Sequence, residues 1–228
     1  MAYDILMACE LIMGSKHITI NKIYDVLNGY FGDLKWWPAE TAFEMMVGAI
    51  LTQNTSWKNV EKAILELKKK KLLVPKKIID VPVSGLSTAI RSSGYHRVKA
   101  GRLKQLARFI MSECGGDLKK LSYMDTRELR EKLLSVKGIG PETADSILLY
   151  AFGKKIFVVD AYTKRIFSRH GILVENALYS DVQNVAHKYF KRGLKEYNQY
   201  HALIVETAKK YCRKHEPLCD ECPIRGIH

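Results

Sequence analysis

The sequence predicts an all-α fold, and two observations support this prediction. Apolar residues recur at the three- and four-residue spacing of a helix face in most segments of the chain. The β-like runs VPV and KIFVV are short and have no partner pattern, so we interpret them as loop and helix entry. No tandem repeat or low-complexity linker is visible. With 228 residues, of which 47% are hydrophobic, the chain can bury one large core or two modest ones.

Three helices are predicted in the N-terminal third of the chain. The first covers ITINKIYDVLNGYFG and ends at Gly32, since glycine often terminates a helix. The second covers TAFEMMVGAILTQ. The third begins near Trp57 and ends in the lysine run 68–71, which we interpret as a solvated helix end. The apolar residues that define the three faces are Ile20, Ile23, Val26 and Leu27, then Phe43, Val47, Ile50 and Leu51, then Trp57, Val60, Ile64 and Leu67.

Four more helices are predicted further along the chain. GRLKQLARFIMSEC shows the same apolar spacing, and TRELREKLLS has Thr126 as its N-cap candidate. PETADSILLYAF opens with Pro141 at the first helical position, where proline is favoured. AYTKRIFSRHG follows Asp160, whose side chain could cap it. These helices frame the two features on which the functional prediction depends.

The composition favours a polyanionic partner. Lysine and arginine number 37 against 24 acidic residues, which gives a net charge of +13 at pH 7. Charge alone does not separate DNA from RNA or from a membrane surface. No stretch approaches the ~20 apolar residues of a membrane span, and the segment MAYDILMACELIM lacks the basic start of a secretory signal. We therefore expect a cytoplasmic protein with no membrane partner.

A Gly-x-Gly turn and a lone aspartate stand out between Leu133 and Phe167. Gly138 and Gly140 lie in the turn KGIG between two predicted helices, and glycine lets the backbone approach another chain closely. The helix after the turn directs its free N–H groups and positive dipole end outward, which suits a phosphate. Asp160 follows the apolar run IFVV, where a carboxylate has little structural use. Together these features indicate chemistry on DNA.

The string L-x-x-x-K-G-I-G-x-x-T-A with its downstream aspartate resembles the helix-hairpin-helix element of the endonuclease III superfamily of DNA base-excision glycosylases. The resemblance continues through GAILTQNTSWKNVEKA and SSGYHRVKAGRL to the C-terminal cysteines, so it covers nearly the whole chain. It implies two helical lobes with a DNA cleft between them. Residues 38–152 would form a six-helix lobe with the helix-hairpin-helix motif. Residues 1–37 and 153–228 would form the second lobe, with a cysteine-rich loop of the iron–sulfur type.

The same resemblance implies how DNA is held. The partner would be double-stranded DNA from which the damaged base is flipped out, a step that costs a few kcal/mol. Gln53 and Tyr95 fall on positions that the superfamily uses to plug and to wedge the duplex, although Tyr95 could equally be an ordinary loop residue. The protein would act as a monomer in the cytoplasm, where it would associate with the nucleoid. The hairpin residues expected to bind DNA are Lys137, Gly138, Ile139, Gly140 and Thr143.

Two positions bear on catalysis. The aspartate that the superfamily shares is present as Asp160. Removal of a base passes through an oxocarbenium-like sugar, and a carboxylate can stabilise that charge or orient the attacking water. In strand-cutting members a lysine stands two residues after the second glycine, where this sequence has Glu142. Because a carboxylate cannot form a Schiff base, the resemblance implies a DNA N-glycosylase without AP-lyase activity.

The substrate prediction depends on aromatic residues. Trp36, Trp37 and Pro38, followed by LTQNTSWKNVEKAI, resemble the bacterial 3-methyladenine DNA glycosylase III branch. This implies a base pocket that also includes Trp57 and Glu142, although tandem tryptophans are more often core residues. A cationic methylated purine is attracted to π-rich walls by ~0.5–2 kcal/mol per contact. We therefore expect excision of alkylated purines, with 3-methyladenine as the first candidate.

Two other functions remain open on the sequence. A uracil or thymine mismatch glycosylase, or an endonuclease III-type glycosylase for oxidised pyrimidines, would have a hydrogen-bonding pocket in place of an aromatic one. A non-catalytic module, which belongs to another class, would bind damaged DNA and would have no use for the carboxylate of Asp160.

A metal site is expected at the C-terminus. Cys212, Cys219 and Cys222 have the spacing C-x6-C-x2-C, which in a cytosolic chain suggests metal rather than disulfide. The iron–sulfur loop of the resembled superfamily reads C-x6-C-x2-C-x5-C, and its fourth position falls on His228. Imidazole can replace thiolate on iron, as in Rieske centres. We expect a 4Fe-4S cluster with His228 as the fourth ligand or with none, and zinc on Cys3His is the alternative.

Overall fold

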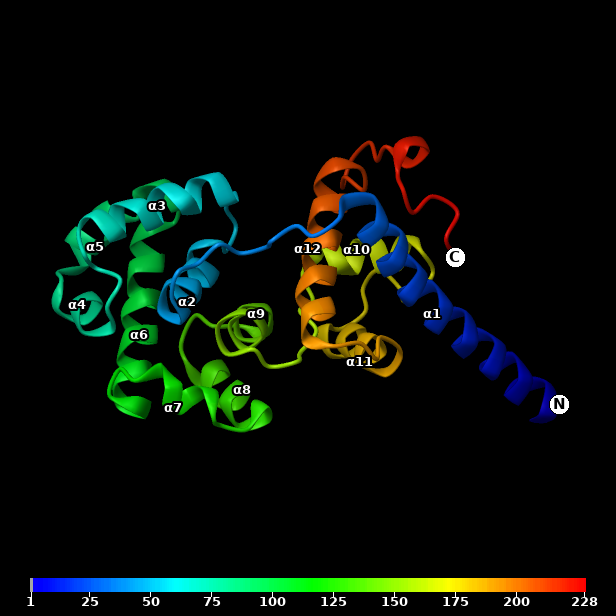
Figure 1. Ribbon diagram of the computed structural model, residues 1–228, viewed down its shortest axis with the longest axis horizontal. Coiled ribbons are helices and arrows are strands. Elements are labelled where there is room, and N and C mark those ends of the chain that lie inside the picture. The colour runs from blue at the N-terminus through cyan, green and yellow to red at the C-terminus, as the bar shows by residue number, and fades with distance from the viewer. Residues whose placement is uncertain (1) are drawn as a thin grey trace. The chain divides into compact units, whose positions relative to one another are not determined.

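The computed structural model describes residues 2–228, with side chains described from His17 onward. The described residues form helices joined by loops and turns, with no strand among them (Figure 1). The all-α fold predicted from the sequence is therefore confirmed. The segment KIFVV, in particular, forms neither strand nor helix. Within the described part of the chain, no helix combines the length and hydropathy needed to cross a membrane.

The chain divides into two compact units. The first consists of Met1–Trp36 and Lys155–His228, and the second is the contiguous segment Trp37–Lys154. The resemblance implies one lobe of residues 38–152 and a second lobe of residues 1–37 and 153–228. This division into lobes stays a prediction.

The first unit is organised around its last long helix, α12, which packs against α1 and α10, while α11 packs against α1 (Figure 1). Its core is aromatic: the rings of Phe190 and Tyr200 have centroids 4.8 Å apart, and the buried Tyr200 hydroxyl donates to the carbonyl of Ile20 at 2.8 Å. The elements of this unit are α1 (Ala2–Phe31), α10 (Ala161–Arg169), α11 (Tyr179–Tyr189), α12 (Leu194–Lys210) and the short 3-10 helix η2 (Cys219–Glu221).

In the second unit, α6 packs against α2, α4, α5 and α7, and α9 packs against both α2 and α8 (Figure 1). This arrangement brings the loop after α2 and the turn between α8 and α9 into one region of the unit. The elements are α2 (Ala42–Leu51), α3 (Trp57–Lys69), α4 (Pro75–Asp80), α5 (Val83–Ala89), η1 (Arg91–Ser93), α6 (His96–Cys114), α7 (Leu118–Ser122), α8 (Thr126–Ser135) and α9 (Pro141–Phe152).

The predicted boundaries at Gly32 and Pro141 are confirmed, and the predicted N-cap at Thr126 is wrong. Gly32, with φ of +66°, follows the last residue of α1, and Pro141 is the first residue of α9. The N-cap of α8 is Asp125, not Thr126, because the Asp125 carboxylate accepts the backbone N–H groups of Arg127 and Glu128 at 2.8 and 3.2 Å. A carboxylate competes well for these N–H groups because it also interacts favourably with the helix dipole.

The lysine run at the end of α3 is only partly solvated. The ammonium of Lys68 lies 2.9 Å from the carboxylate of Glu44 and 2.7 Å from that of Glu40. Glu44 is 5% exposed, so this ion pair neutralises a buried charge on α2. The interpretation of the whole run as a solvated helix end is therefore wrong for Lys68.

Candidate functional site

The Gly-x-Gly turn joins α8 to α9 as a hairpin of two helices. Gly138 has φ of +97°, a conformation that L side chains rarely adopt. Gly140, the N-cap of α9, has no side chain that could accept the first N–H groups of the helix, and such a helix start suits an anion. The two helices are held together by an ion pair in which Arg130 Nε lies 2.6 Å from the fully buried carboxylate of Asp145. The ion pair therefore fixes the two helices of the hairpin to each other, and anion binding at the start of α9 stays a prediction.

Gln53 connects the loop after α2 to this hairpin. Its Nε2 donates to the carbonyl of Gly138 at 3.1 Å and to the hydroxyl of Thr143 at 3.0 Å. Its amide oxygen accepts from the guanidinium of Arg102 on α6. The stem of Arg102 also fills the space in front of Gly138, where an added Cβ would lie 2.5 Å from Arg102 Cγ. Three of the predicted DNA-binding residues thus form one network.

A second side chain of α6 connects the last residue of α2 to η1, the short helix that precedes α6. The ammonium of Lys99 donates to the carbonyls of Leu51 and Ser93 at 2.8 and 2.6 Å. Lys99 is 1% exposed. Burial and, to a smaller extent, the nearby charge of Arg102 together lower the pKa of Lys99 from 10.5 to about 8.

Tyr95, the residue expected to wedge the duplex, follows η1, which Lys99 holds. Its backbone is left-handed, with φ of +45° and ψ of +29°, at the N-cap of α6. Its side chain is 70% exposed. The structure therefore presents an aromatic ring on a constrained backbone, next to a short helix fixed from inside the unit.

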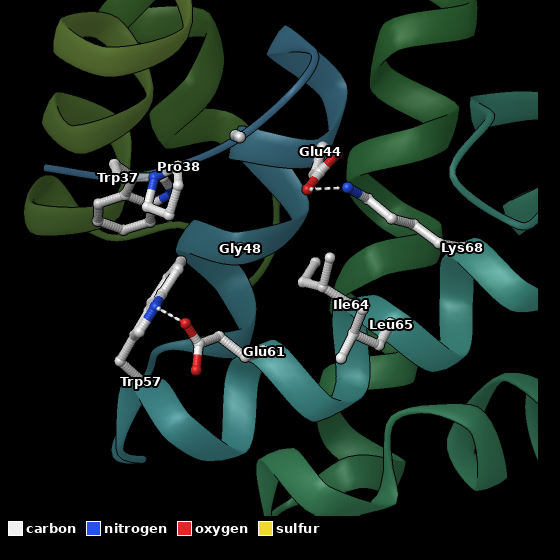
Figure 2. Close-up of a pocket in the computed structure, with 10 residues that line it drawn as sticks. Trp37, Pro38, Glu44, Gly48, Trp57, Glu61, Ile64, Leu65 and Lys68 are labelled. Carbon is white, nitrogen blue, oxygen red and sulfur yellow. Dashed lines mark hydrogen bonds and ion pairs between the residues drawn. The ribbon is translucent and has the colours of Figure 1, made fainter. Parts of the chain in front are cut away.

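A pocket of about 260 Å³ lies between α2, α3 and the segment that precedes α2. Trp37, Pro38 and Trp57 line it, so the structure brings together three of the five predicted base-pocket residues (Figure 2). The Trp37 and Trp57 rings meet edge to face, with centroids 5.4 Å apart. The other lining residues are Ala39, Glu44, Gly48, Glu61, Ile64, Leu65 and Lys68.

The other two predicted base-pocket residues lie elsewhere. Trp36 belongs to the first unit, where the ammonium of Lys209 lies 5.4 Å from its ring centroid. Among the described residues, the buried Nε1 of Trp36 has no hydrogen-bond partner. Glu142 is exposed in the first turn of α9 and does not line the pocket of Trp37 and Trp57. A role for Trp36 and Glu142 at the base stays a prediction.

Asp160 is the N-cap of α10, as the sequence suggested. One carboxylate oxygen, Oδ1, accepts from the backbone N–H of Thr163 at 2.7 Å and from its hydroxyl at 2.9 Å. The other oxygen, Oδ2, lies 3.5 Å from Nε2 of His201 on α12. The side chains of Asp160 and His201 are 11% and 8% exposed. The two oxygens therefore have different surroundings, and capping fixes the orientation of the carboxylate.

The environment keeps Asp160 ionised. Burial alone would raise the pKa of this carboxyl. The contact with His201 and the two hydrogen bonds from Thr163 more than offset that effect, so the pKa of Asp160 lies below its ordinary value. Asp160 is consequently a carboxylate at neutral pH, which is the form that can stabilise a developing positive charge.

The cysteine-rich segment after α12 is anchored to α10 by two arginines. Arg165 donates to the carbonyl of Cys212 at 2.7 Å, and Arg169 donates to its Sγ at 3.3 Å. Burial raises the pKa of the Cys222 thiol, and the nearby thiols of Cys212 and Cys219 raise it further. A guanidinium donor beside the sulfur of Cys212 also suits a thiolate ligand.

The side chains of this segment are not assembled as a metal site. Within the described residues, no three His, Cys, Asp or Glu side chains converge in a group that could hold a metal ion. The ring of His228 lies near that of His170, with centroids 6.1 Å apart. The donor chemistry fits a cluster, while ligation by Cys212, Cys219, Cys222 and His228 stays a prediction.

Sequence reasoning missed several residues that organise these features. Lys99 lies four residues before Leu103, so it falls on the N-terminal extension of the apolar stripe of α6. A lysine on such a stripe indicates a buried charged side chain. Arg102 gave no comparable signal. His201 lies on α12, a helix that was not predicted, and its position beside Asp160 depends on the packing of α10 against α12.

Comparison with known proteins identifies related sequences. Residues 47–192 match the family of HhH-GPD superfamily base excision DNA repair proteins. A candidate DNA repair glycosylase of Methanocaldococcus jannaschii is 51% identical over 213 residues, which cover 92% of this chain and 96% of that protein. An endonuclease III of Sulfolobus acidocaldarius is 30% identical over 186 residues, which cover 80% of this chain and 79% of that protein.

Solved structures show the same fold. The 3-methyladenine DNA glycosylase of H. pylori (MagIII), bound to 1,N6-ethenoadenine, superposes with a TM-score of 0.72 at 28% identity, over 84% of this chain and 97% of that chain. A non-covalent endonuclease III–DNA complex superposes with a TM-score of 0.79 at 22% identity, over 92% and 94% of the two chains. The second of these likenesses bears on the fold alone.

Proposed function

Since this chain belongs to the HhH-GPD superfamily of base excision DNA repair proteins, it is a DNA glycosylase. We propose that it excises alkylated purines from double-stranded DNA. We take 3-methyladenine as the first candidate substrate. The observation that carries this proposal is the pocket in which Trp37 and Trp57 meet. Aromatic walls favour an electron-poor cationic purine over a neutral base. The H. pylori relative, named for 3-methyladenine, supports the same choice.

We propose that Asp160 is the catalytic residue. An alkylated purine carries a positive charge that weakens its own glycosidic bond, so the bond can break without protonation of the base. The purine leaves as a neutral molecule, and the positive charge that develops on the sugar is stabilised by the Asp160 carboxylate. Water then adds to the sugar carbon and loses a proton to solvent. The ionised state of Asp160 and the fixed orientation of its carboxylate support this role.

We propose that the second unit holds the DNA through the hairpin and the two loops beside it. The N–H groups at the start of α9 and the side chain of Lys137 would bind phosphate. With the base flipped out, Gln53 would plug the duplex and Tyr95 would wedge it. The network from Arg102 through Gln53 to Gly138 supports a joint action of these elements. A monomer suffices for this arrangement.

We propose that the enzyme has no AP-lyase activity, because Glu142 stands where the Schiff-base lysine of the strand-cutting relatives would be. Borohydride should therefore trap no covalent adduct between the protein and DNA, and abasic sites should remain uncut until alkali is added. A trapped adduct would show that another amine forms the Schiff base.

The cysteine-rich segment would hold a 4Fe-4S cluster through Cys212, Cys219 and Cys222, with His228 as the fourth ligand or with none, and zinc is the alternative. In this position the group would organise the basic loop that carries Arg213, Lys214 and Arg225, and it would contribute nothing to bond breaking.

The substrate is tested by identifying the bases that the protein releases. DNA treated with a methylating agent and DNA containing uracil or oxidised pyrimidines should be incubated with the protein, and the released bases separated by chromatography. We expect 3-methyladenine to be released fastest. Release of oxidised pyrimidines alone would favour the alternative of an endonuclease III-type glycosylase. Binding to damaged DNA without release of any base would identify a non-catalytic module.

A further inference from the structure

The pocket of Trp37 and Trp57 contains more negative than positive charge. Its charged lining residues are Glu44, Glu61 and Lys68, so two carboxylates stand against one ammonium. That ammonium is also shared with a third carboxylate outside the lining, Glu40, at 2.7 Å. The chain as a whole carries a net charge of +13, so a negative pocket is contrary to its general composition. Such a pocket attracts a cation and gives no advantage to a neutral ligand.

The carboxylate of Glu61 is joined to one of the two aromatic walls. The indole Nε1 of Trp57 donates to Oε1 of Glu61 at 2.7 Å, and the two residues lie one turn apart on α3 (Figure 2). A hydrogen bond to an ionised acceptor is stronger than one between neutral groups. It also shifts electron density from the N–H bond into the indole ring, which makes the face of the ring a better partner for a cation.

The two walls are held in different ways. Trp37 stacks on Tyr150 with centroids 5.1 Å apart and planes at 27°, and its Nε1 lies 3.3 Å from the place where a Cβ of Gly48 would be. Trp37 is therefore packed from two sides. The polar anchor of Trp57 is Glu61, and the Glu44–Lys68 ion pair lies at the other end of the pocket (Figure 2). Removing the charge of Glu61 would thus act on Trp57 and leave Trp37 in place.

We infer that Glu61 is a specificity-determining residue of the base pocket, which orients Trp57 and favours a cationic base over a neutral one. This inference rests on the proposed function, because it takes the pocket of Trp37 and Trp57 as the place where the flipped base binds.

The test compares a cationic and a neutral purine in the same duplex. Single-turnover release of 7-methylguanine and of hypoxanthine should be measured for the wild type and for Glu61→Gln, together with the affinity of each duplex. Glutamine keeps an acceptor for the Trp57 N–H and removes only the charge. The preference for the cationic base should fall about three- to tenfold, as expected for one charge close to another in a partly solvated site.

Two further variants separate the parts of the effect. Glu66→Gln removes a charge from an exposed position on the same helix, outside the pocket, and should leave the preference unchanged. Trp57→Phe removes the N–H donor but keeps a ring, so adding Glu61→Gln to it should change the preference less than Glu61→Gln does alone.

The outcomes distinguish this inference from the function on which it rests. If the wild type releases and binds neither modified purine and also releases no 3-methyladenine from methylated DNA, the proposed function fails. If the wild type prefers 7-methylguanine and Glu61→Gln has the same preference in both release and affinity, the function stands and the inference is wrong. An equal loss in Glu66→Gln would also overturn it, because the effect would then reflect the general charge of α3.

Discussion

At the scale of single residues, Asp160 shows how one side chain can serve the fold and the reaction. Its Oδ1 caps α10, and its Oδ2 faces His201 at 3.5 Å. A cap alone would not need the second oxygen, and a base-excision site needs a carboxylate whose orientation is fixed. The structure therefore makes the structural and the proposed catalytic roles compatible.

Asp160→Asn should separate these roles. Asparagine keeps an oxygen that can cap α10, while the charge that would stabilise the sugar cation is lost. We expect base release to fall at least a hundredfold, on the order of the loss seen when a transition-state donor is removed, with DNA affinity close to that of the wild type. Asp125→Asn, which alters the equivalent cap of α8, is the matched control and should leave the rate unchanged. Undiminished turnover of Asp160→Asn would exclude a catalytic role.

Lys99 predicts a specific pH dependence of stability. Its pKa is about 8 in the folded protein and 10.5 in its ordinary state, so between these values the unfolded chain binds the additional proton. The contribution of Lys99 to stability is therefore complete above pH 10.5, decreases as the pH falls from 10.5 to 8, and is lost below pH 8. Relative to Lys99→Met, the free energy of unfolding of the wild type should rise by about 2 kcal/mol between pH 7 and 9.5. Urea unfolding of both proteins at the two pH values measures this difference, and parallel curves would contradict it.

At the scale of elements, the hairpin is useful because its turn and α6 fit together. Gly138 gives the turn its positive φ and leaves room for the Arg102 side chain, which in turn holds Gln53. The hairpin, the loop after α2 and η1 are all tied to α6 through Lys99 and Arg102. The elements proposed to contact DNA are thus supported from one helix of the same unit.

Gly138→Ala should disrupt this support. The new Cβ would lie 2.5 Å from Arg102 Cγ and would force an unfavourable φ. The backbone strain alone should cost about 1–2 kcal/mol. This loss of stability should lower the melting temperature by several degrees. DNA affinity should also fall, because Gln53 loses its fixed position. Gly140→Ala is the matched control, because nothing lies within 4 Å of its added Cβ and its φ is −96°. Equal melting temperatures for the two variants would show that Arg102 and Gly138 are not coupled.

At the scale of the whole molecule, the chain combines a general positive charge with local departures from it. The net charge of +13 suits a duplex, while the pocket of Trp37 and Trp57 is negative. The first unit takes its residues from both ends of the chain and ends in the cysteine-rich segment. The metal content of that segment is therefore measured on the intact chain.

Iron analysis of the purified chain tests the cluster. We expect a brown protein with about four iron and four sulfide ions per chain, and Cys219→Ser should lose them. Cys114→Ser changes a buried thiol on α6, outside the segment, and should keep the metal. One zinc ion per chain would favour the Cys3His site. Metal-free protein would show that the histidine in the fourth position has abolished cluster binding.

The helical fold, the Gly-x-Gly hairpin and the cap at Asp160 could be predicted from the sequence. These features depend on contacts between residues a few positions apart, and such contacts leave a periodic or local signal. The structure alone decided that Trp37 and Trp57 share a pocket while Trp36 belongs to the other unit, and that His201 lies beside Asp160. Those neighbours are brought together by the packing of whole helices, which no local pattern of side chains records.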